Sequence, residues 1–237
     1  MAAAEMWVAA LASQDAKLLE LLRSGASPHP PTGAQLFGRP IDKHKDDEEY
    51  TFAKSTNYRF IYTHPDRPIS LDPGQLRTYR VTVTPEALAR TTAWLNSQYP
   101  GLVAYKRKVI RELLQTGLAH NPWGRYRDLS WAVRSWSQEL REHAAQAALN
   151  FGIQTAIGEV MNDAFVKAWD ILPAPARLII QCHDELVAFT PLEGQVPAVA
   201  AALRGAIEQP VPELGGAVLP AEVKVGPTWG EMKPYAR

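Results

Sequence analysis

Two short β-prone runs lie so close together in the sequence that only a tight antiparallel hairpin can join them. Arg177–Gln181 and Leu186–Phe189 are rich in branched and aromatic residues, and only Cys182–Glu185 separates them. Asp184 and Glu185 would then stand at the tip, where adjacent carboxylates repel each other and lose solvation unless a cation compensates. A divalent metal would do so, although on this residue pair alone a solvent-facing acidic turn is the simpler interpretation.

Helical periodicity accounts for much of the remaining chain. The apolar spacing, N-cap residues and glycine stops predict helices over residues 5–23, 46–62, 85–98, 101–115, 140–169 and 196–207. Residues 221–225 are expected to form a further strand. Residues 68–83 are rich in Pro, Gly and Asp, which predicts a loop with at most one short strand, and a loop is also expected over residues 123–127.

Composition narrows the class of protein. The chain has 237 residues, of which 46% are hydrophobic and 21% charged, enough for one large domain or two small ones and too apolar for a disordered chain. Its single cysteine, Cys182, excludes an internal disulfide and a cysteine-based zinc cluster. No secretory signal and no apolar run of about 20 residues is present. We therefore expect a soluble protein of a reducing compartment, without membrane association.

Charge and aromatic patterning leave two interpretations open. The net charge is zero, which excludes a surface that is positively charged all round, yet the basic residues come in groups. Each group alone, such as the one at Lys106–Arg111, indicates a solvated helix face more readily than a nucleic-acid contact. Lys54, Tyr58 and Tyr62 recur every four residues and so share one face of their helix. Singly, a solvated lysine and two partly buried tyrosines are the simpler interpretation.

Six segments together resemble the motifs of one enzyme family. Ile180–Val187 resembles the polymerase C motif of family A DNA polymerases, the DNA polymerase I type, which has the approximate pattern L-x-Q-V-H-D-E-L. Five other family patterns occur in the same order along the chain: K-x-x-N-[FY]-G-x-x-Y at Lys54–Tyr62, Y-P-G-V at Tyr99–Gly101, G-R-x-R at Gly124–Arg127, N-x-P-x-Q at Asn150–Gln154, and V-x-V-G-x-x-W at Val223–Trp229. The resemblance covers nearly the whole chain.

The start of the chain resembles the region after the family's polymerase A motif, D-x-x-x-x-E-L-x-x-x-A. Glu5 matches the glutamate of that pattern, which places the motif's metal-binding aspartate one position before Met1. Phosphoryl transfer at a two-metal site needs carboxylates from separate elements. We expect that another polypeptide supplies this aspartate, that the start site has been placed late, or that the chain is a degenerate relative.

The resemblance implies catalytic and nucleotide-binding roles. Asp184 would be the catalytic metal ligand for Mg²⁺. Glu185 would assist it and is the member of the pair that the family requires less strictly. Lys54 would contact the triphosphate of the incoming nucleotide, Tyr58 its sugar and base, and His29 a phosphate. In the same family pattern Glu5 and Tyr62 would form a pair that crowds the 2′ position of the sugar and so favours deoxynucleotides.

The resemblance also implies DNA contacts, and the sequence departs from the family at three other positions. His183 would touch the primer end, while Asn150, Gln154 and Arg125 would touch the primer and template. Asn150 and Gln154 could equally satisfy each other inside a buried helix. The departures weaken the triphosphate and backbone contacts: Tyr50 and Gln146 each stand where the family has arginine, and Arg59 where it has glycine.

These implications together predict a fold, a division of the chain and a function. The resemblance implies an α+β fold like DNA polymerase I but without a thumb, with a palm-proximal segment at residues 1–12, helical fingers at 13–135 and a palm with an antiparallel sheet at 136–237. The expected function is template-directed DNA polymerase, as a C-terminal fragment or split subunit in the cytoplasm of a bacterial or phage-infected cell. Its partners would be primer–template DNA, dNTP and a second polypeptide that supplies the thumb and the missing aspartate. The alternative is a catalytically incomplete protein that binds primer–template DNA or a replication partner.

Overall fold

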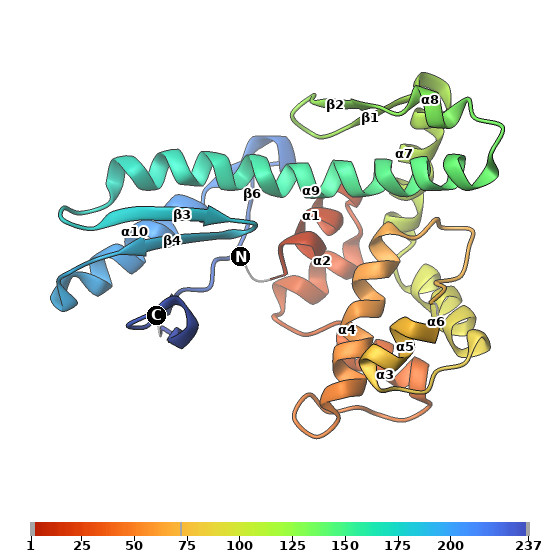
Figure 1. Cartoon of the computed structure of the whole chain (residues 1–237), viewed down its shortest axis with the longest axis horizontal. Coiled ribbons are helices and arrows are strands. Elements are labelled where there is room, and N and C mark those ends of the chain that lie inside the picture. The colour runs from red at the N-terminus through yellow and green to blue at the C-terminus, as the bar shows by residue number, and fades with distance from the viewer. Residues whose placement is uncertain (1–2, 72, 236–237) are drawn as a thin grey trace. The chain divides into compact units, whose positions relative to one another are not determined.

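The computed structural model describes residues 3–71 and 73–235, which are mostly helical with short antiparallel strand pairs (Figure 1). The chain divides into two compact units. One, which we call the helical unit, is Ala9–Gly152; the other, the hairpin unit, combines Met1–Val8 with Ile153–Arg237. Two helices contain the boundaries between the units: α1 (Ala4–Ser13) and α9 (Gln138–Ile171).

The helical unit is a set of helices with one small hairpin. Its elements are α2 (Ala16–Arg23), α3 (His29–Phe37), α4 (Asp47–Tyr62), α5 (Pro73–Tyr79), α6 (Pro85–Gln98), α7 (Pro100–Thr116), β1 (Leu118–His120), β2 (Tyr126–Asp128) and α8 (Ser130–Val133). Helix α6 has the predicted bounds, and α7 is one residue longer at each end than the helix predicted over residues 101–115. The Thr84 hydroxyl caps α6 by accepting from the amide of Ala87 at 3.2 Å, and Gly117, with φ 77°, ends α7.

Asp15 connects two helices of this unit. It is 2% exposed, and its Oδ1 accepts from the Leu18 amide at the start of α2 at 3.0 Å. Its Oδ2 accepts from the Leu102 amide at the start of α7 at 3.2 Å. Helix α7 has no side-chain cap of its own, so one carboxylate satisfies the free amides of two helix starts.

Three predictions for this region are wrong. The single helix expected over residues 5–23 is two helices, α1 and α2, because Asp15 starts a new helix. Residues 68–83 contain helix α5 and, among the described residues, no strand. The loop expected over residues 123–127 joins an unpredicted hairpin, β1–β2, in which His120 pairs with Tyr126. Strands of three residues are too short to show an alternating pattern.

The hairpin unit contains the predicted acidic hairpin. Strands β3 (Arg177–Cys182) and β4 (Glu185–Phe189) pair antiparallel, with Cys182 opposite Glu185 and a register shift between Leu178 and Ile180. Helix α10 (Val196–Ile207) lies along the hairpin, as Figure 1 shows, and its bounds are those predicted.

The rest of the hairpin unit is short and irregular. It contains three 3-10 turns, η1 (Glu193–Gln195), η2 (Pro212–Leu214) and η3 (Trp229–Glu231), together with strands β5 (Pro210–Val211), β6 (Ala217–Val218), β7 (Lys224–Val225) and β8 (Lys233–Pro234). Strand β7 covers only the end of the strand predicted at residues 221–225, and it pairs with β8. In the described part of the chain, none of the helices has the length and hydrophobicity of a membrane span.

Candidate active site

The turn of the β3–β4 hairpin holds the acidic residues in a constrained backbone. His183 has φ 55°, in the left-handed region that β-hairpin turns of two residues use and that non-glycine residues rarely adopt. Its Nδ1 lies 3.5 Å from Oδ1 of Asp184, and their side chains are 65% and 27% exposed. Glu185 opens β4 and is exposed. The sequence thus places one carboxylate partly out of water at the tip and a second beside it.

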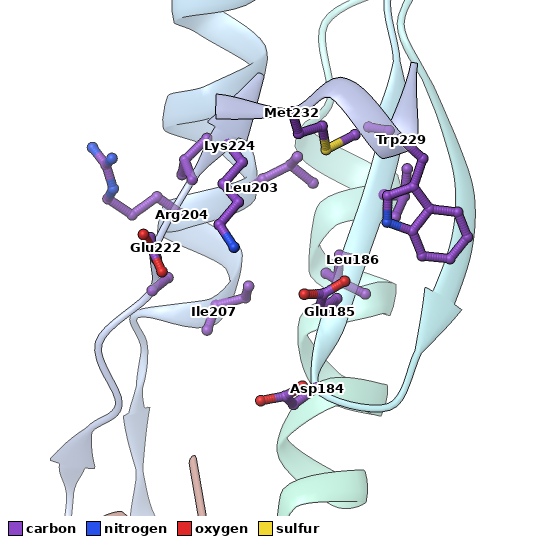
Figure 2. A pocket seen from close by; sticks show the side chains of 14 residues that line it. Asp184, Glu185, Leu186, Leu203, Arg204, Ile207, Glu222, Lys224, Trp229 and Met232 are labelled. Atoms are coloured by element: carbon purple, nitrogen blue, oxygen red, sulfur yellow. The ribbon is translucent and has the colours of Figure 1, made fainter. Parts of the chain in front are cut away.

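Both carboxylates line a pocket of about 400 Å³ within the hairpin unit (Figure 2). One wall is made by consecutive residues 184–188, and the opposite wall by consecutive residues 221–224. Because side chains alternate across a strand, an unbroken run of lining residues means that the pocket follows the backbone edge of β4. Figure 2 shows Leu203 and Ile207 of α10 between these walls.

The pocket carries charges of both signs. Asp184, Glu185 and Glu222 contribute carboxylates, and Arg204 and Lys224 contribute cations. The Nε of Arg204 is buried without a hydrogen-bond partner among the described residues. A buried unpaired donor beside a polar pocket is a group that an anionic or carbonyl ligand could satisfy.

The fit to a metal ion is partial. Carboxylate oxygens are the donors that Mg²⁺ prefers, and Asp184 and Glu185 offer them at one pocket. Across residues 3–71 and 73–235, however, no three His, Cys, Asp or Glu side chains are grouped to hold a metal ion. The described residues therefore supply part of a donor set, and the assignment of Asp184 as a metal ligand stays a prediction.

Glu5 and Gln154 meet inside the hairpin unit. The Nε2 of Gln154 donates to the carboxylate of Glu5, and both side chains are half-buried. Sequence analysis placed Glu5 beside Tyr62 and Gln154 on DNA, and it missed this contact between residues 149 positions apart. Asn150, predicted to contact DNA from the same helix, α9, is exposed.

In the helical unit, the predicted nucleotide-binding residues lie on α4 and at the start of α3. Lys54 is exposed, whereas Tyr58 and Tyr62 are half-buried. His29 is 7% exposed, and its ring centroid lies 6.2 Å from that of Tyr58 and 5.6 Å from that of Tyr50. The structure therefore brings together His29 and Tyr58, which the sequence analysis assigned to one nucleotide.

His29 carries no charge at neutral pH. Burial, and to a smaller extent the nearby cation of Lys54, lower its pKa to about 4. Tyr50, which replaces the arginine of the family pattern, has its hydroxyl 3.1 Å from that of Ser27. Among these residues Lys54 is the cation available to a phosphate group.

Arg125 lies in the turn between β1 and β2 and is exposed. The Oδ1 of Asn121 accepts from the backbone amides of Trp123 and Arg125, both at 3.0 Å, so this side chain fixes the turn. Gly124 adopts φ 77° there. Arg125 is thus presented to solvent from an ordered turn, as a backbone phosphate contact requires.

Comparison with known proteins identifies the family. The family model described as DNA polymerase family A matches residues 2–231. The chain belongs to DNA polymerase family A. It is 28% identical to DNA polymerase I of Streptococcus pneumoniae over 97% of this chain and 25% of the relative. It is also 28% identical to the thermostable DNA polymerase I of Thermus thermophilus, over 94% of the chain and 25% of that protein.

A phage relative matches the chain in sequence, and a solved structure matches it in fold. The DNA polymerase of Mycobacterium phage D29 is 28% identical over 81% of the chain and 28% of its own length. The solved POL domain of Pol1 from M. smegmatis, in complex with a DNA primer-template and dNTP, matches with a TM-score of 0.70 at 23% identity. That match covers 87% of this chain and 35% of the other. The predicted α+β, polymerase I-like fold is confirmed. The chain spans about a quarter of the length of the curated relatives it matches.

Proposed function

We propose that this family A chain takes part in template-directed DNA synthesis, the transfer of a deoxynucleotide to a primer 3′ end, as a C-terminal portion or split subunit of a polymerase. The observation that carries the proposal is Asp184, a partly buried carboxylate on a constrained hairpin turn that opens into a charged pocket. Relatives of the chain are DNA polymerases, and a structural neighbour binds primer-template and dNTP.

In this proposal Asp184, with Glu185 beside it, supplies part of the ligand set for Mg²⁺. When bound in pairs, such ions stabilise the attacking and leaving oxygens of phosphoryl transfer. The remaining contribution of this chain is positioning: Lys54 offers a compact exposed cation to the triphosphate, His29 a neutral ring, and Tyr58 an aromatic face.

The proposed division of labour follows the family pattern. Residues 1–12 are assigned to a palm-proximal segment, residues 13–135 to the fingers and residues 136–237 to the palm. His183, Asn150, Gln154 and Arg125 are assigned to primer and template, and Glu5 with Tyr62 to discrimination at the 2′ position of the sugar. The hydrogen bond from Gln154 supports the role of Glu5, because it restricts the carboxylate to one direction.

We also propose that a second polypeptide completes the pocket. Within the described residues, β4 pairs only with β3, and its other edge borders the pocket over residues 184–188. A free strand edge pairs with an extended segment through backbone hydrogen bonds. A segment entering there with an aspartate would add a carboxylate close to Asp184. The bacterial and phage relatives suggest the cytoplasm of a bacterial or phage-infected cell as the place of action.

A primer-extension assay tests the proposed activity. The chain is incubated with primer–template DNA, the four dNTPs and Mg²⁺, alone and with the part of the S. pneumoniae relative that precedes the region aligned with this chain. We expect little or no extension by the chain alone, extension on complementation, and loss of that extension with Asp184→Ala. A matched Asp170→Ala variant, altered at an exposed residue of α9, should retain it. Robust extension by Asp184→Ala would contradict the metal assignment.

One observation favours the alternative function, a catalytically incomplete protein that binds primer–template DNA. Tyr50 stands where the family has an arginine and faces Ser27, so α4 has fewer cations for a triphosphate. This alternative predicts tight binding of primer–template DNA with no extension under any complementation. Fluorescence anisotropy of labelled primer–template DNA, measured beside the extension assay, separates the two functions.

A further inference from the structure

Asn57 occupies the buried interface between α3 and α4. It is 1% exposed, and both ends of its amide make hydrogen bonds. Its Nδ2 donates to the carbonyl oxygen of Ala53, one turn earlier in α4, at 3.0 Å, and lies 3.2 Å from Nδ1 of His29. Its Oδ1 accepts from the hydroxyl of Thr32 at 3.0 Å. None of these contacts involves solvent, so Asn57 is built into the interior.

The carbonyl of Ala53 decides which way the amide points. A carbonyl oxygen can only accept, so the atom 3.0 Å from it must be the NH₂ group of Asn57. The reversed amide would place its own carbonyl oxygen against that of Ala53, so that two acceptors would face each other in the interior. Since the same NH₂ group faces Nδ1 of His29, that ring nitrogen must be the acceptor.

The acceptor role of Nδ1 determines where the proton of His29 sits. A neutral imidazole carries one proton, and if Nδ1 accepts, the proton is on Nε2. The ring is neutral because it is buried beside Tyr50 and Tyr58 and lies near the Lys54 cation, all three on α4. The two ring nitrogens point in widely different directions, so the Nε2 proton is directed away from Asn57.

We propose that Asn57 is a positioning residue that holds His29 in its neutral form with the proton on Nε2, so that the ring offers a hydrogen-bond donor to a phosphate oxygen of the incoming nucleotide. This inference rests on the proposed function, because the nucleotide role of His29 belongs to it. In this arrangement Lys54 contributes the charge, and His29 contributes one directional donor that an acceptor-only phosphate can use.

Nitrogen NMR of the full chain with ¹⁵N-labelled histidine tests the positioning step without nucleotide or activity. Comparison with His29→Gln assigns the resonances among the six histidines. We expect His29 at pH 7 to show a protonated Nε2 and an unprotonated Nδ1. In Asn57→Asp, a carboxylate faces the ring, and we expect a proton on Nδ1 and a pKa raised by at least about one unit. In Asn57→Leu, which removes the donor, the preference for one tautomer should be lost.

The control is Asn96→Asp, the same substitution at a half-buried asparagine of α6 that donates to the carbonyl of Pro65. It should leave the His29 resonances unchanged. A protonated Nδ1 or a doubly protonated ring in the unaltered chain at pH 7 would overturn the proposal. The proposal would also be overturned if the tautomer and the pKa of His29 were unchanged in both Asn57 variants while circular dichroism showed that these variants are folded.

A second measurement separates this inference from the proposed function. Mg²⁺·dNTP is titrated into the labelled chain, and we expect the Nε2 resonance of His29 to shift, with affinity reduced about tenfold in Asn57→Leu. In the complemented extension assay the same variant should raise KM for dNTP more than it lowers kcat. If the tautomer is as expected but dNTP moves no His29 resonance, the phosphate role is overturned. If dNTP shifts the His29 resonance but the complemented chain does not extend primers, the proposed polymerase function is contradicted and the role of Asn57 is not.

Discussion

Lys106 carries a buried amine that satisfies the end of a neighbouring helix. It lies on α7, is 1% exposed, and its Nζ donates to the carbonyl oxygen of Phe60 at 2.8 Å. That carbonyl belongs to the last turn of α4, where backbone acceptors lack intrahelical partners. The Nζ also lies 3.9 Å from the centroid of the Phe60 ring. Helix α4, which carries Lys54, Tyr58 and Asn57, is thus held at its C-terminal end by a residue that the sequence analysis assigned to a basic surface group.

The protonation of Lys106 makes stability depend on pH. Burial lowers its pKa to about 7 from an ordinary value of 10.5, with Asp66 opposing the shift. Between these two values the unfolded chain binds more protons than the folded chain, so the free energy of unfolding should rise with pH, by up to about 1.4 kcal/mol per pH unit. The neutral amine still donates to Phe60. We expect the stability of the natural chain relative to Lys106→Met to increase from pH 7 to pH 10, measured by urea unfolding.

Lys108 provides the matched control for this pH dependence. It lies on the same helix with a side chain that is 70% exposed. The difference between the natural chain and Lys108→Met should stay flat over the same pH range. An equally flat difference for Lys106→Met would contradict the depressed pKa.

The left-handed backbone of His183 predicts which residues the hairpin turn accepts. With φ 55°, this position tolerates asparagine, which adopts the left-handed region more often than other residues, and disfavours β-branched residues. We expect His183→Val to lower the free energy of unfolding by about 1–2 kcal/mol and His183→Asn to change it little. Urea unfolding compares the two variants. Equal stability of both variants would show that the turn relaxes to another conformation.

At the scale of elements, Asp15 caps two helices, so the free energy of unfolding should fall in two steps as its two capping bonds are removed. Asp15→Asn keeps one acceptor oxygen and should lose one of the two capping bonds, whereas Asp15→Ala loses both. At about 1 kcal/mol per cap, we expect losses of about 1 and about 2 kcal/mol in the free energy of unfolding. Thermal and urea unfolding measure them. Asp128→Ala removes a single exposed hydrogen bond from the Ser130 amide and should cost less than Asp15→Ala. The reverse order would contradict the double role of Asp15.

The elements also show what local sequence can predict. The hairpin β3–β4, helix α10 and the helices α6 and α7 followed from periodicity, a Thr84 cap and a Gly117 stop, which act within a few residues. Helix α3 and the β1–β2 hairpin did not, because they are short and have no clear period. Within the site, the place of Asp184 at the hairpin turn followed from local sequence, whereas its role as a metal ligand is implied only by the family resemblance. The contacts of Glu5 with Gln154 and of His29 with Asn57 join distant segments, which no local pattern records.

At the scale of the whole molecule, zero net charge means that DNA affinity must come from localised basic residues. Each neutralised phosphate adds about 0.9 to the slope of log affinity against log salt concentration. We expect Arg125→Ala to reduce the steepness of that slope by about 0.9, the contribution of one phosphate contact. Fluorescence anisotropy of labelled primer–template DNA, from low to moderate salt, measures the slope. Arg23→Ala, at an exposed position of α2 without an assigned DNA role, should leave the slope unchanged. An unchanged slope in Arg125→Ala would remove Arg125 from the DNA interface.

The hairpin unit exposes apolar surface that supports a further polypeptide partner. Val166, Trp169, Ile179 and Phe189 are 63%, 69%, 59% and 57% exposed, and exposed groups of this kind mark interaction surfaces. We expect the chain alone to associate in sedimentation velocity and to bind the preceding part of the S. pneumoniae relative. A bulky Ala188→Trp, placed on the wall of the pocket, should reduce that binding because it occupies the free edge of β4. Ala201→Trp, at an exposed position of α10, should not. A monodisperse, stable monomer indifferent to both substitutions would contradict a partner at this edge.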